Sequence, residues 1–213
     1  MARSAARPRP TLVIMVRHGQ TPTTGRELPG RAPGLHLSDT GRAQARAAAE
    51  RIGAMGKVDA IYASPLERTR ETAAPIAAAL GLKVRIERGL LEVDVGNWTG
   101  HELKVARRQP EWKAVQHYPS GFRFPGGESF VEMQARMLGA LGRLTAAHPG
   151  QTIVAVSHAD TIKAAVAHAL GTHLDLFQRI VISPCSISTV MYGDTGPMVL
   201  AVNSVPDAKA GAR

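Results

Sequence analysis

Leu12-Val13-Ile14-Met15-Val16, followed directly by Arg17-His18-Gly19-Gln20-Thr21, is the stretch that decides the fold. Its first half is a continuous apolar run, which is typical of a strand buried on both faces of a parallel sheet. Its second half turns polar and places an arginine, a histidine and a glycine where the strand ends. An open α/β sheet binds its ligands outside the carboxyl ends of its strands. The stretch therefore predicts a central strand with a ligand site beside it.

The rest of the chain alternates strand and helix signals, which favours βαβ units around a mainly parallel sheet. Further strands are expected at 58–63, 83–87 and 152–156, and two or three more within 179–202, where antiparallel pairing at the sheet edge is one arrangement. Helices are expected from Ser38 or Asp39 to about Met55, from Ser64-Pro65 to Leu80, over 130–144 and over 160–170. Ser64 has the chemistry of an N-cap and Gly81 that of a helix end. The predicted fold class is α/β, a three-layer α/β/α sandwich with a mainly parallel central sheet.

The length of 213 residues and a hydrophobic content of 44% fit one domain with a full core. We expect this domain to span residues 11–203. Residues 1–10 have the composition of a disordered basic tail, and residues 204–213 that of a flexible tail. Residues 88–128 show little regular pattern apart from a short helix near 101–108. Such a long excursion is a candidate lid or substrate loop.

A formal net charge of +9 predicts anionic partners. The arginines form no long basic run and few aromatic residues accompany them, so a small phosphorylated metabolite is favoured over nucleic acid. The apolar run 12–16 is far too short for a membrane span, and we expect no membrane partner. The single cysteine, Cys185, cannot form an internal disulfide, which fits a reducing cytoplasm. Self-association as a homodimer is left open.

Polar side chains follow four of the expected strands. Arg17 and His18 follow the first, Arg68 lies in the first helical turn after the second, Glu92 follows the third, and His158 follows the strand at 152–156. A phosphate monoester dianion calls for planar, permanently charged donors, which the two arginines supply. A neutral imidazole is a competent nucleophile toward phosphorus. These residue types together predict phosphoryl transfer.

Each of these residues alone also has an ordinary structural explanation. His18 could be a hydrogen-bonded structural histidine, Arg68 a solvated helix charge and Glu92 a loop carboxylate. Their joint placement at strand ends carries the hypothesis. Other catalytic plans fit worse: residues 53–57 are too short for a phosphate-binding Walker loop, there is no His-Glu-x-x-His motif, and one cysteine cannot build a zinc cluster. We therefore expect no metal and no cofactor.

Six motifs follow one another along about residues 11–202. They are Arg17–Thr21, Leu37–Gly41, Ser64–Thr69, Leu91–Gly100, Phe124–Ser129 and Val156–His158. In this order they resemble the histidine phosphatase superfamily, which includes the cofactor-dependent phosphoglycerate mutases. The chain is most similar to a branch of small actinobacterial-type probable phosphomutases and phosphatases. The resemblance implies a phosphoglycerate mutase-like fold.

The resemblance also implies roles for individual residues. His18 would be the nucleophile that becomes phosphorylated, while Arg17, Arg68 and His158 would bind the phosphoryl oxygens. His158 is counted among the catalytic residues for this reason. Glu92 would be the general acid for the leaving alcohol and then the base for the attacking water. Asp94, two residues further on, is the alternative acid.

Several neighbouring positions bear on the substrate. Gly19 would let the backbone pass close to the bound oxyanion. Thr24 stands where many relatives carry Asn, and it can still donate a hydrogen bond. Glu128 either supports the pocket from behind or caps the next helix, with equal weight. Asp160 either adds negative charge near the pocket, where it would favour a cationic or hydroxyl-rich group, or caps the following helix, and capping is the favoured interpretation.

The function expected from all this is a metal-independent phosphatase that hydrolyses a small phosphorylated metabolite through a phosphohistidine. One alternative is a phosphomutase of the phosphoglycerate mutase type, although the chain has little room for the insertions that shield the intermediate in larger mutases. Another is a non-catalytic phosphate-binding regulatory module. The residues that select the substrate are expected in loops 20–36 and 99–128.

Overall fold

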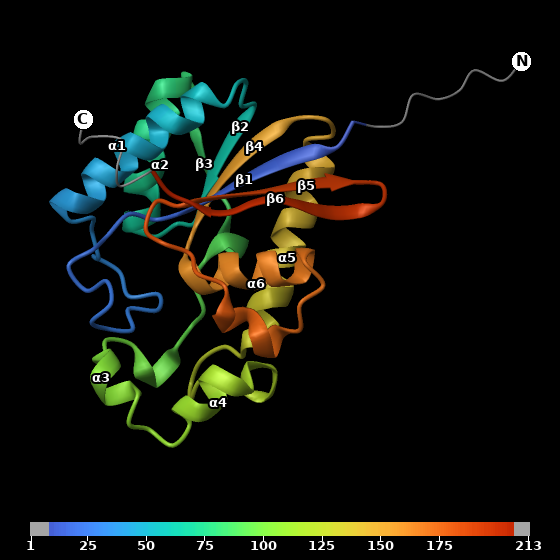
Figure 1. The fold of residues 1–213 in the computed structure, drawn as a ribbon. Helices are drawn as coiled ribbons and strands as arrows, with labels where there is room; N and C mark the ends of the chain where they lie inside the picture. Colours follow the sequence, from blue (N-terminus) through green and yellow to red (C-terminus); the bar gives the residue numbers. More distant parts are fainter. Residues whose placement is uncertain (1–8, 207–213) are drawn as a thin grey trace, which may run out of the picture.

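A six-stranded sheet in the order β3-β2-β4-β1-β5-β6 forms the centre of the molecule (Figure 1). The computed structural model describes residues 9–206, so the predicted tails lie almost wholly outside the described residues. The strands are β1 Thr11–Arg17, β2 Ala60–Ala63, β3 Val84–Ile86, β4 Thr152–Ser157, β5 Ile187–Gly193 and β6 Gly196–Ser204. The first four in sequence pair in parallel, whereas β5 and β6 form an antiparallel edge next to β1. The predicted fold class is confirmed.

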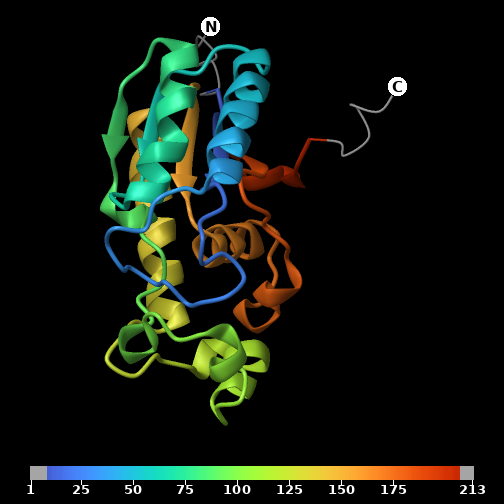
Figure 2. The same ribbon diagram turned by 90° about the vertical axis from the view of Figure 1, so that its left-hand side faces the viewer.

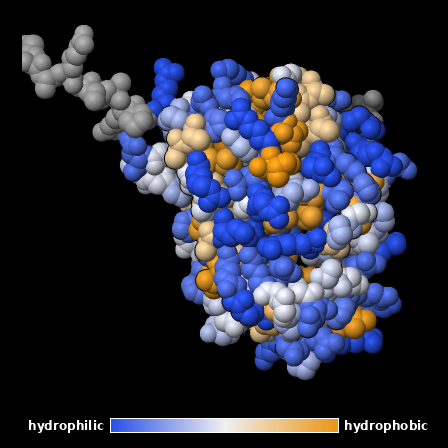
Figure 3. Space-filling model, turned by 180° about the vertical axis from the view of Figure 1, so that it is seen from behind, coloured by the Kyte–Doolittle hydropathy of each residue, from blue (hydrophilic) through white to orange (hydrophobic). Residues whose placement is uncertain are grey.

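Helices cover both faces of this sheet (Figures 1 and 2). The longer ones are α1 Asp39–Ala54, α2 Glu67–Leu80, α5 Phe130–Ala147 and α6 Ala159–Ala169. On one face α1 and α2 pack over the sheet, and on the other face α5 and α6 do so. Among the described residues no helix is both long enough and apolar enough to cross a membrane. The face of the molecule seen in Figure 3 is mostly hydrophilic, with small hydrophobic areas between.

The continuous apolar run of β1 is explained by these two layers. Val13 and Met15 belong to the cluster formed with α5 and α6, whereas Ile14 and Val16 belong to the cluster formed with α1 and α2. Alternate residues of a strand point to opposite faces, so a strand covered on both sides needs apolar side chains at every position. β1 is therefore fixed between two cores.

The excursion over 88–128 contains two short helices, α3 Leu103–Ala106 and α4 Trp112–His117. The predicted helix near 101–108 corresponds to α3, while α4 was not expected. Figure 1 shows both helices beyond the end of the sheet. The segment forms a third apolar cluster together with α5 and α6. In it, Trp98, Phe122 and Phe124 of the segment pack with Phe130 of α5. It is thus a packed extension rather than an open loop.

The start of α2 differs from the prediction. The helix begins at Glu67 rather than at Pro65, and its N-cap is Leu66, which makes no side-chain capping bond. The Ser64 hydroxyl is instead hydrogen-bonded to the ring of His158, 2.9 Å away. The prediction that Ser64 is the N-cap was wrong, because its hydroxyl is hydrogen-bonded to His158, the residue that follows β4. Gly81 ends the helix in a left-handed conformation, as predicted.

Gly19 has a packing role that the sequence analysis did not foresee. A Cβ on Gly19 would lie 2.6 Å from the carbonyl oxygen of Gly41, and a Cβ on Gly41 would lie 2.0 Å from that of Gln20. The loop after β1 and the first turn of α1 therefore cross at backbone contact distance. Here glycine serves the packing of loop against helix, and that contact holds the loop after His18 in place.

We expect Gly41→Ala to lower the free energy of unfolding by about 1–3 kcal/mol, because the new methyl group overlaps backbone that cannot rotate away. The matched control is Gly53→Ala in the same helix, where a Cβ meets nothing within 4 Å. That change should raise the stability by about 0.5–1 kcal/mol through helix propensity. Urea unfolding of the three proteins measures both effects. Equal stability of the two variants would contradict this account of the contact.

Candidate active site

Three parallel strands end at the same level and place the central groups of the site. Arg17 at the end of β1 lies opposite Ser157 at the end of β4, and the His18 amide donates to the Ser157 carbonyl over 2.9 Å. His158 directly follows β4, and its ring centroid lies 5.2 Å from that of His18. The Ser64 amide, after β2, donates to Val156. Strand register thus brings the two predicted histidines together.

His18 has the tautomer that a nucleophile needs. Its Nδ1 lies 2.8 Å from the Gly19 carbonyl oxygen, which can only accept, so Nδ1 carries the proton and Nε2 carries the lone pair. Burial, followed by the positive charges of Arg68 and Arg17, holds the pKa of His18 well below its usual value. The ring is therefore neutral at physiological pH and its Nε2 is free to attack.

Two arginines supply the positive charge of the site. Arg68 is fully buried, and among the described residues only its Nη2 has a protein partner, the Gly30 carbonyl oxygen at 2.7 Å. Its Nε and Nη1 are buried without a partner. Arg17 donates from Nη1 to Ile182, also over 2.7 Å, and its Nε is buried without a partner. Buried donors left open in this way are expected where an anion binds.

His158 lies behind His18 and is fully buried. Its Nε2 is hydrogen-bonded to Ser64, while its Nδ1 has no partner. Burial, then Arg68 and His18, hold the pKa of His158 well below its usual value. It is not among the residues that line the cavity described below. The structure thus places His158 against His18 but outside the cavity lining.

Glu92 faces the same cavity with an opposite electrostatic balance. Burial raises the pKa of its carboxyl group to about 7, with a further contribution from the negative charge of Asp160. The amide of Val93, 3.0 Å from Oε1, and the two arginines act against this rise. A carboxyl group that titrates near neutral pH can hold a proton and later take one up, which is what a general acid and base requires.

The loop that carries Glu92 is held by a network that the sequence did not reveal. Arg31 and Arg136 both donate to the Glu92 carbonyl oxygen, and both bind the Glu128 carboxylate at 2.8 Å. Arg136 also donates to the carbonyl oxygens of Gly89 and Leu91. Glu128 therefore supports the loop that carries Glu92 through these two arginines. The N-cap of α5 is Ser129 rather than Glu128. No spacing pattern marks these arginines, because their partners are mostly backbone atoms.

Asp94, the alternative acid, is engaged elsewhere. Its carboxylate accepts from the Gly96 amide at 3.0 Å and lies 3.5 Å from Arg31. It is absent from the cavity lining. Of the two carboxylates in this loop, only Glu92 is placed to meet a bound substrate.

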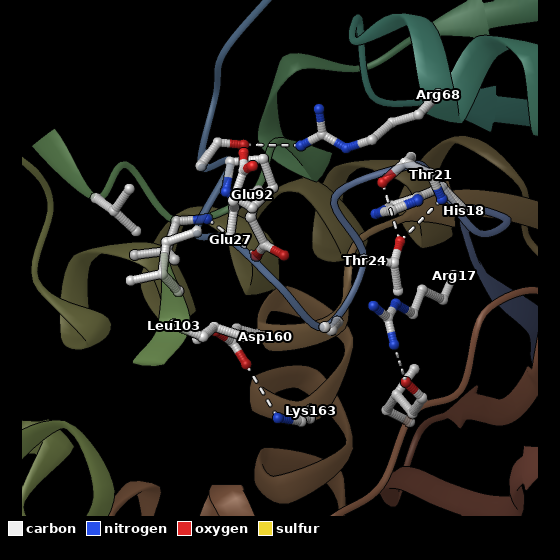
Figure 4. A pocket seen from close by; sticks show the side chains of 18 of the residues that line it. Arg17, His18, Thr21, Thr24, Glu27, Arg68, Glu92, Leu103, Asp160 and Lys163 are labelled. Carbon is white, nitrogen blue, oxygen red and sulfur yellow. Dashed lines mark hydrogen bonds and ion pairs between the residues drawn. The ribbon is translucent and has the colours of Figure 1, made fainter. Parts of the chain in front are cut away.

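A cavity of about 370 Å³ is lined by Arg17, His18, Arg68 and Glu92 (Figure 4). Its lining comes from the strand ends, from loop 20–36 as expected, from Asp160, and from residues that the sequence analysis did not select: Ala159, Lys163, Gln178, Ile180, Val181 and Ile182. From the expected loop 99–128 only Leu103 contributes. Residues 174–179 form a short 3-10 helix, and this segment lies outside the two loops that were expected to select the substrate. The size suits a small metabolite.

Thr24 and Asp160 complete the polar lining. Thr24 accepts a hydrogen bond from the Thr21 amide over 2.9 Å and lies 2.9 Å from the Thr21 hydroxyl. Asp160 is not the N-cap of α6, a position held by His158. Its carboxylate accepts from Lys163 over 3.1 Å and lines the cavity. The favoured interpretation of Asp160 as a cap was wrong, because the helix begins one residue earlier than expected.

Within residues 9–206 no group of three or more His, Cys, Asp or Glu side chains is arranged to hold a metal ion. The positive charge beside His18 in this cavity comes from the two arginines. Preorganised cationic donors of this kind can stabilise a phosphoryl group in the way a bound metal does elsewhere.

Comparison with known proteins gives this arrangement a family. Residues 13–205 match the family model described as histidine phosphatase superfamily, branch 1. The chain belongs to the histidine phosphatase superfamily. This agrees with the resemblance drawn from the motifs.

Among curated relatives, a bifunctional protein of Mycobacterium tuberculosis is 33% identical over 204 residues, which are 94% of this chain and 56% of that protein. The chain thus spans little more than half the length of this relative. Phosphoserine phosphatase 1 of Hydrogenobacter thermophilus is 32% identical, over 90% of this chain and 91% of that protein.

Solved structures of the same fold include enzymes with two different named substrates. A mycobacterial glucosyl-3-phosphoglycerate phosphatase superimposes with a TM-score of 0.82 at 26% identity, over 92% of this chain and 100% of the other. A phosphoserine phosphatase of Entamoeba histolytica in complex with 3-phosphoglyceric acid gives 0.82 at 27% identity, over 92% and 98%. These neighbours support a phosphatase.

We expect Glu128→Gln to lower the free energy of unfolding by about 1–3 kcal/mol, because two largely covered arginines lose their shared counter-charge. It should also slow turnover of alkyl phosphates by about tenfold, since the backbone of Glu92 loses its support. Urea unfolding and steady-state kinetics measure the two effects. The control is Glu132→Gln in the first turn of α5, which affects a solvent-exposed pair with Arg123 and should change the stability by less than about 1 kcal/mol. Equal effects of the two changes would contradict the supporting role of Glu128.

Proposed function

We propose that this protein is a phosphatase that hydrolyses the phosphate monoester of a small metabolite through a phosphohistidine at His18, without a metal ion. The observation that carries the proposal is the hydrogen bond from His18 Nδ1 to the Gly19 carbonyl, which leaves Nε2 as the unprotonated ring nitrogen beside two arginines with free donors. The single buried cysteine fits action in the cytoplasm.

In the first step, Nε2 of His18 attacks phosphorus and the bond from phosphorus to the alcohol oxygen breaks. Glu92 gives its proton to that oxygen, because an alkoxide is a poor leaving group near neutral pH. The imidazole becomes positively charged while it carries the phosphoryl group, and its Nδ1–H remains bonded to the Gly19 carbonyl. Arg17 and Arg68 hold the phosphoryl oxygens in both the ground state and the transition state.

In the second step, water attacks phosphorus and the bond between phosphorus and Nε2 breaks. Glu92, now ionised, takes the proton from the water, so that both Glu92 and His18 return to their starting states. His158 lies against His18 and can contact a phosphoryl oxygen through Nδ1, which has no protein partner. The atoms and protons therefore balance over one turnover without any further group.

We expect a phosphoenzyme on His18. With a labelled monoester in the presence of EDTA, rapid quenching without acid should trap an acid-labile, base-stable phosphoprotein, because a phosphoramidate bond has those properties. His18→Ala should abolish the label. If His18→Ala is still labelled, the nucleophile is another residue. If EDTA prevents labelling and a divalent cation restores it, the reaction depends on a metal. Isomerised phosphoester in place of free phosphate would favour the phosphomutase alternative.

We expect Glu92→Gln to affect substrates according to their leaving group. Alkyl phosphates should be slowed by about 10²–10⁴-fold, the usual contribution of general acid catalysis, whereas p-nitrophenyl phosphate should still give a burst of nitrophenol followed by slow turnover. In the unaltered protein, turnover of alkyl phosphates should fall as the pH rises through about 7, because Glu92 then loses the proton it must donate. The variant should lack this limb of the pH profile.

The control for this experiment is Asp94→Asn, in the same loop but outside the cavity lining. Asp94→Asn should behave like the unaltered protein. It should show neither the leaving-group-dependent loss nor the burst followed by slow turnover that is expected for Glu92→Gln. If Asp94→Asn gives the leaving-group-dependent loss and Glu92→Gln slows both substrates equally, then Asp94 is the acid.

A further inference from the structure

The cavity is divided by charge. Figure 4 shows Arg68, His18 and Arg17 on one side and Glu92, Glu27 and Asp160 on the other. All six line the same cavity. One side therefore suits a dianion, and the other presents carboxylates to whatever is attached to it.

The cationic side fixes the direction in which a substrate must lie. Arg68 is completely buried and two of its guanidinium nitrogens have no protein partner, which accounts for the phosphoryl group. Glu92 must reach the oxygen that links phosphorus to the alcohol. The alcohol portion then extends from that oxygen toward Glu27 and Asp160.

The carboxylates on this side are incompletely neutralised. Asp160 pairs with Lys163 through Oδ1, and Lys163 also donates to Gln178 over 2.9 Å. Among the described residues Glu27 takes part in no ion pair. Of these two carboxylates, only Asp160 has a basic partner among the described residues, and Asp160 also acts electrostatically on Glu92. Apolar residues of the cavity lining include Leu28, Val95, Leu103 and Ile180.

We propose that the alcohol portion of the substrate carries a protonated amine, so that the substrate class is the aminoalkyl phosphates, with Glu27 and Asp160 as acceptors for the ammonium group. This inference rests on the proposed function. An ammonium group supplies the missing positive charge and offers several N–H donors to carboxylate oxygens. A carboxylate or second phosphate in the same place would face like charges, which is unfavourable. A neutral polyol would satisfy the hydrogen bonds but leave the negative charge uncompensated.

The test compares substrates that differ mainly in the charge of the alcohol portion. These are O-phosphoethanolamine, propyl phosphate, glycerol 1-phosphate and phosphoglycolate. At a pH at which the amine is protonated, kcat/KM for phosphoethanolamine should exceed that for propyl phosphate and for glycerol 1-phosphate by about tenfold, the effect of one modest charge interaction. Phosphoglycolate should be the poorest of the four.

Variants then locate the preference. Glu27→Gln and Asp160→Asn should each reduce the ratio of kcat/KM between phosphoethanolamine and propyl phosphate several-fold, by removing one carboxylate charge each. The ratio cancels any general effect of either change on the rate. Glu50→Gln on the exposed face of α1 is the matched control and should leave the ratio unchanged.

Binding to the His18→Ala protein, measured by calorimetry, gives a second readout that does not depend on turnover. Tighter binding of phosphoethanolamine than of propyl phosphate, lost when Glu27→Gln is added, supports the inference. If the protein with His18 intact then releases no phosphate from any of these esters, only the proposed function fails. Hydrolysis of all four esters with equal kcat/KM, or a preference that both variants retain, overturns the inference and leaves the phosphatase standing. A preference for glycerol 1-phosphate would replace the amine by a polyol.

Discussion

The in-register pairing of β1, β4 and β2 is the constraint on which the rest of the site depends. Because these strands are parallel and end together, His18, His158 and Ser64 become neighbours without any specialised loop. The apolar clusters on both sheet faces make a slip in register costly. A shift by one residue would move every side chain of the strand to the opposite face, where it does not fit the packing. The positions of the reactive groups are therefore fixed by the core.

Opposite pKa shifts in one cavity follow from where each residue lies relative to the arginines. Burial acts on both His18 and Glu92, and it favours the neutral form of each. For His18 the neighbouring arginines add to this effect. For Glu92 they oppose it, and Asp160 restores it. The outcome is a neutral imidazole and a carboxyl group that titrates near pH 7 in one cavity, the pair of states that the proposed phosphoryl transfer requires.

The sequence predicted what depends on strand ends and short motifs. The central strand, the fold class and the gathering of Arg17, His18, Arg68, Glu92 and His158 around one region all follow from patterns within a few residues of a strand. The support of the acid loop by Arg31 and Arg136 could not be predicted, because guanidinium groups that bind backbone carbonyls leave no spacing signal. Nor could Ser64 and Asp160 be placed, since the short-range sequence pattern favoured helix capping for both. The Ser64 hydroxyl instead binds His158, which is far away in the sequence, and α6 begins one residue before Asp160.

The open donors of Arg68 have a consequence for the empty protein. A buried guanidinium group with acceptors for only some of its donors is costly, and a tetrahedral oxyanion that accepts from Nε and Nη1 of Arg68 would relieve that cost. Inorganic phosphate, the product of the proposed reaction, fits the same donors as the ester. The protein should accordingly melt at a higher temperature in phosphate buffer than in a buffer without oxyanions, by an amount set by mass action. In a cell, the ambient phosphate concentration would then act at once as a stabiliser and as a competitive brake.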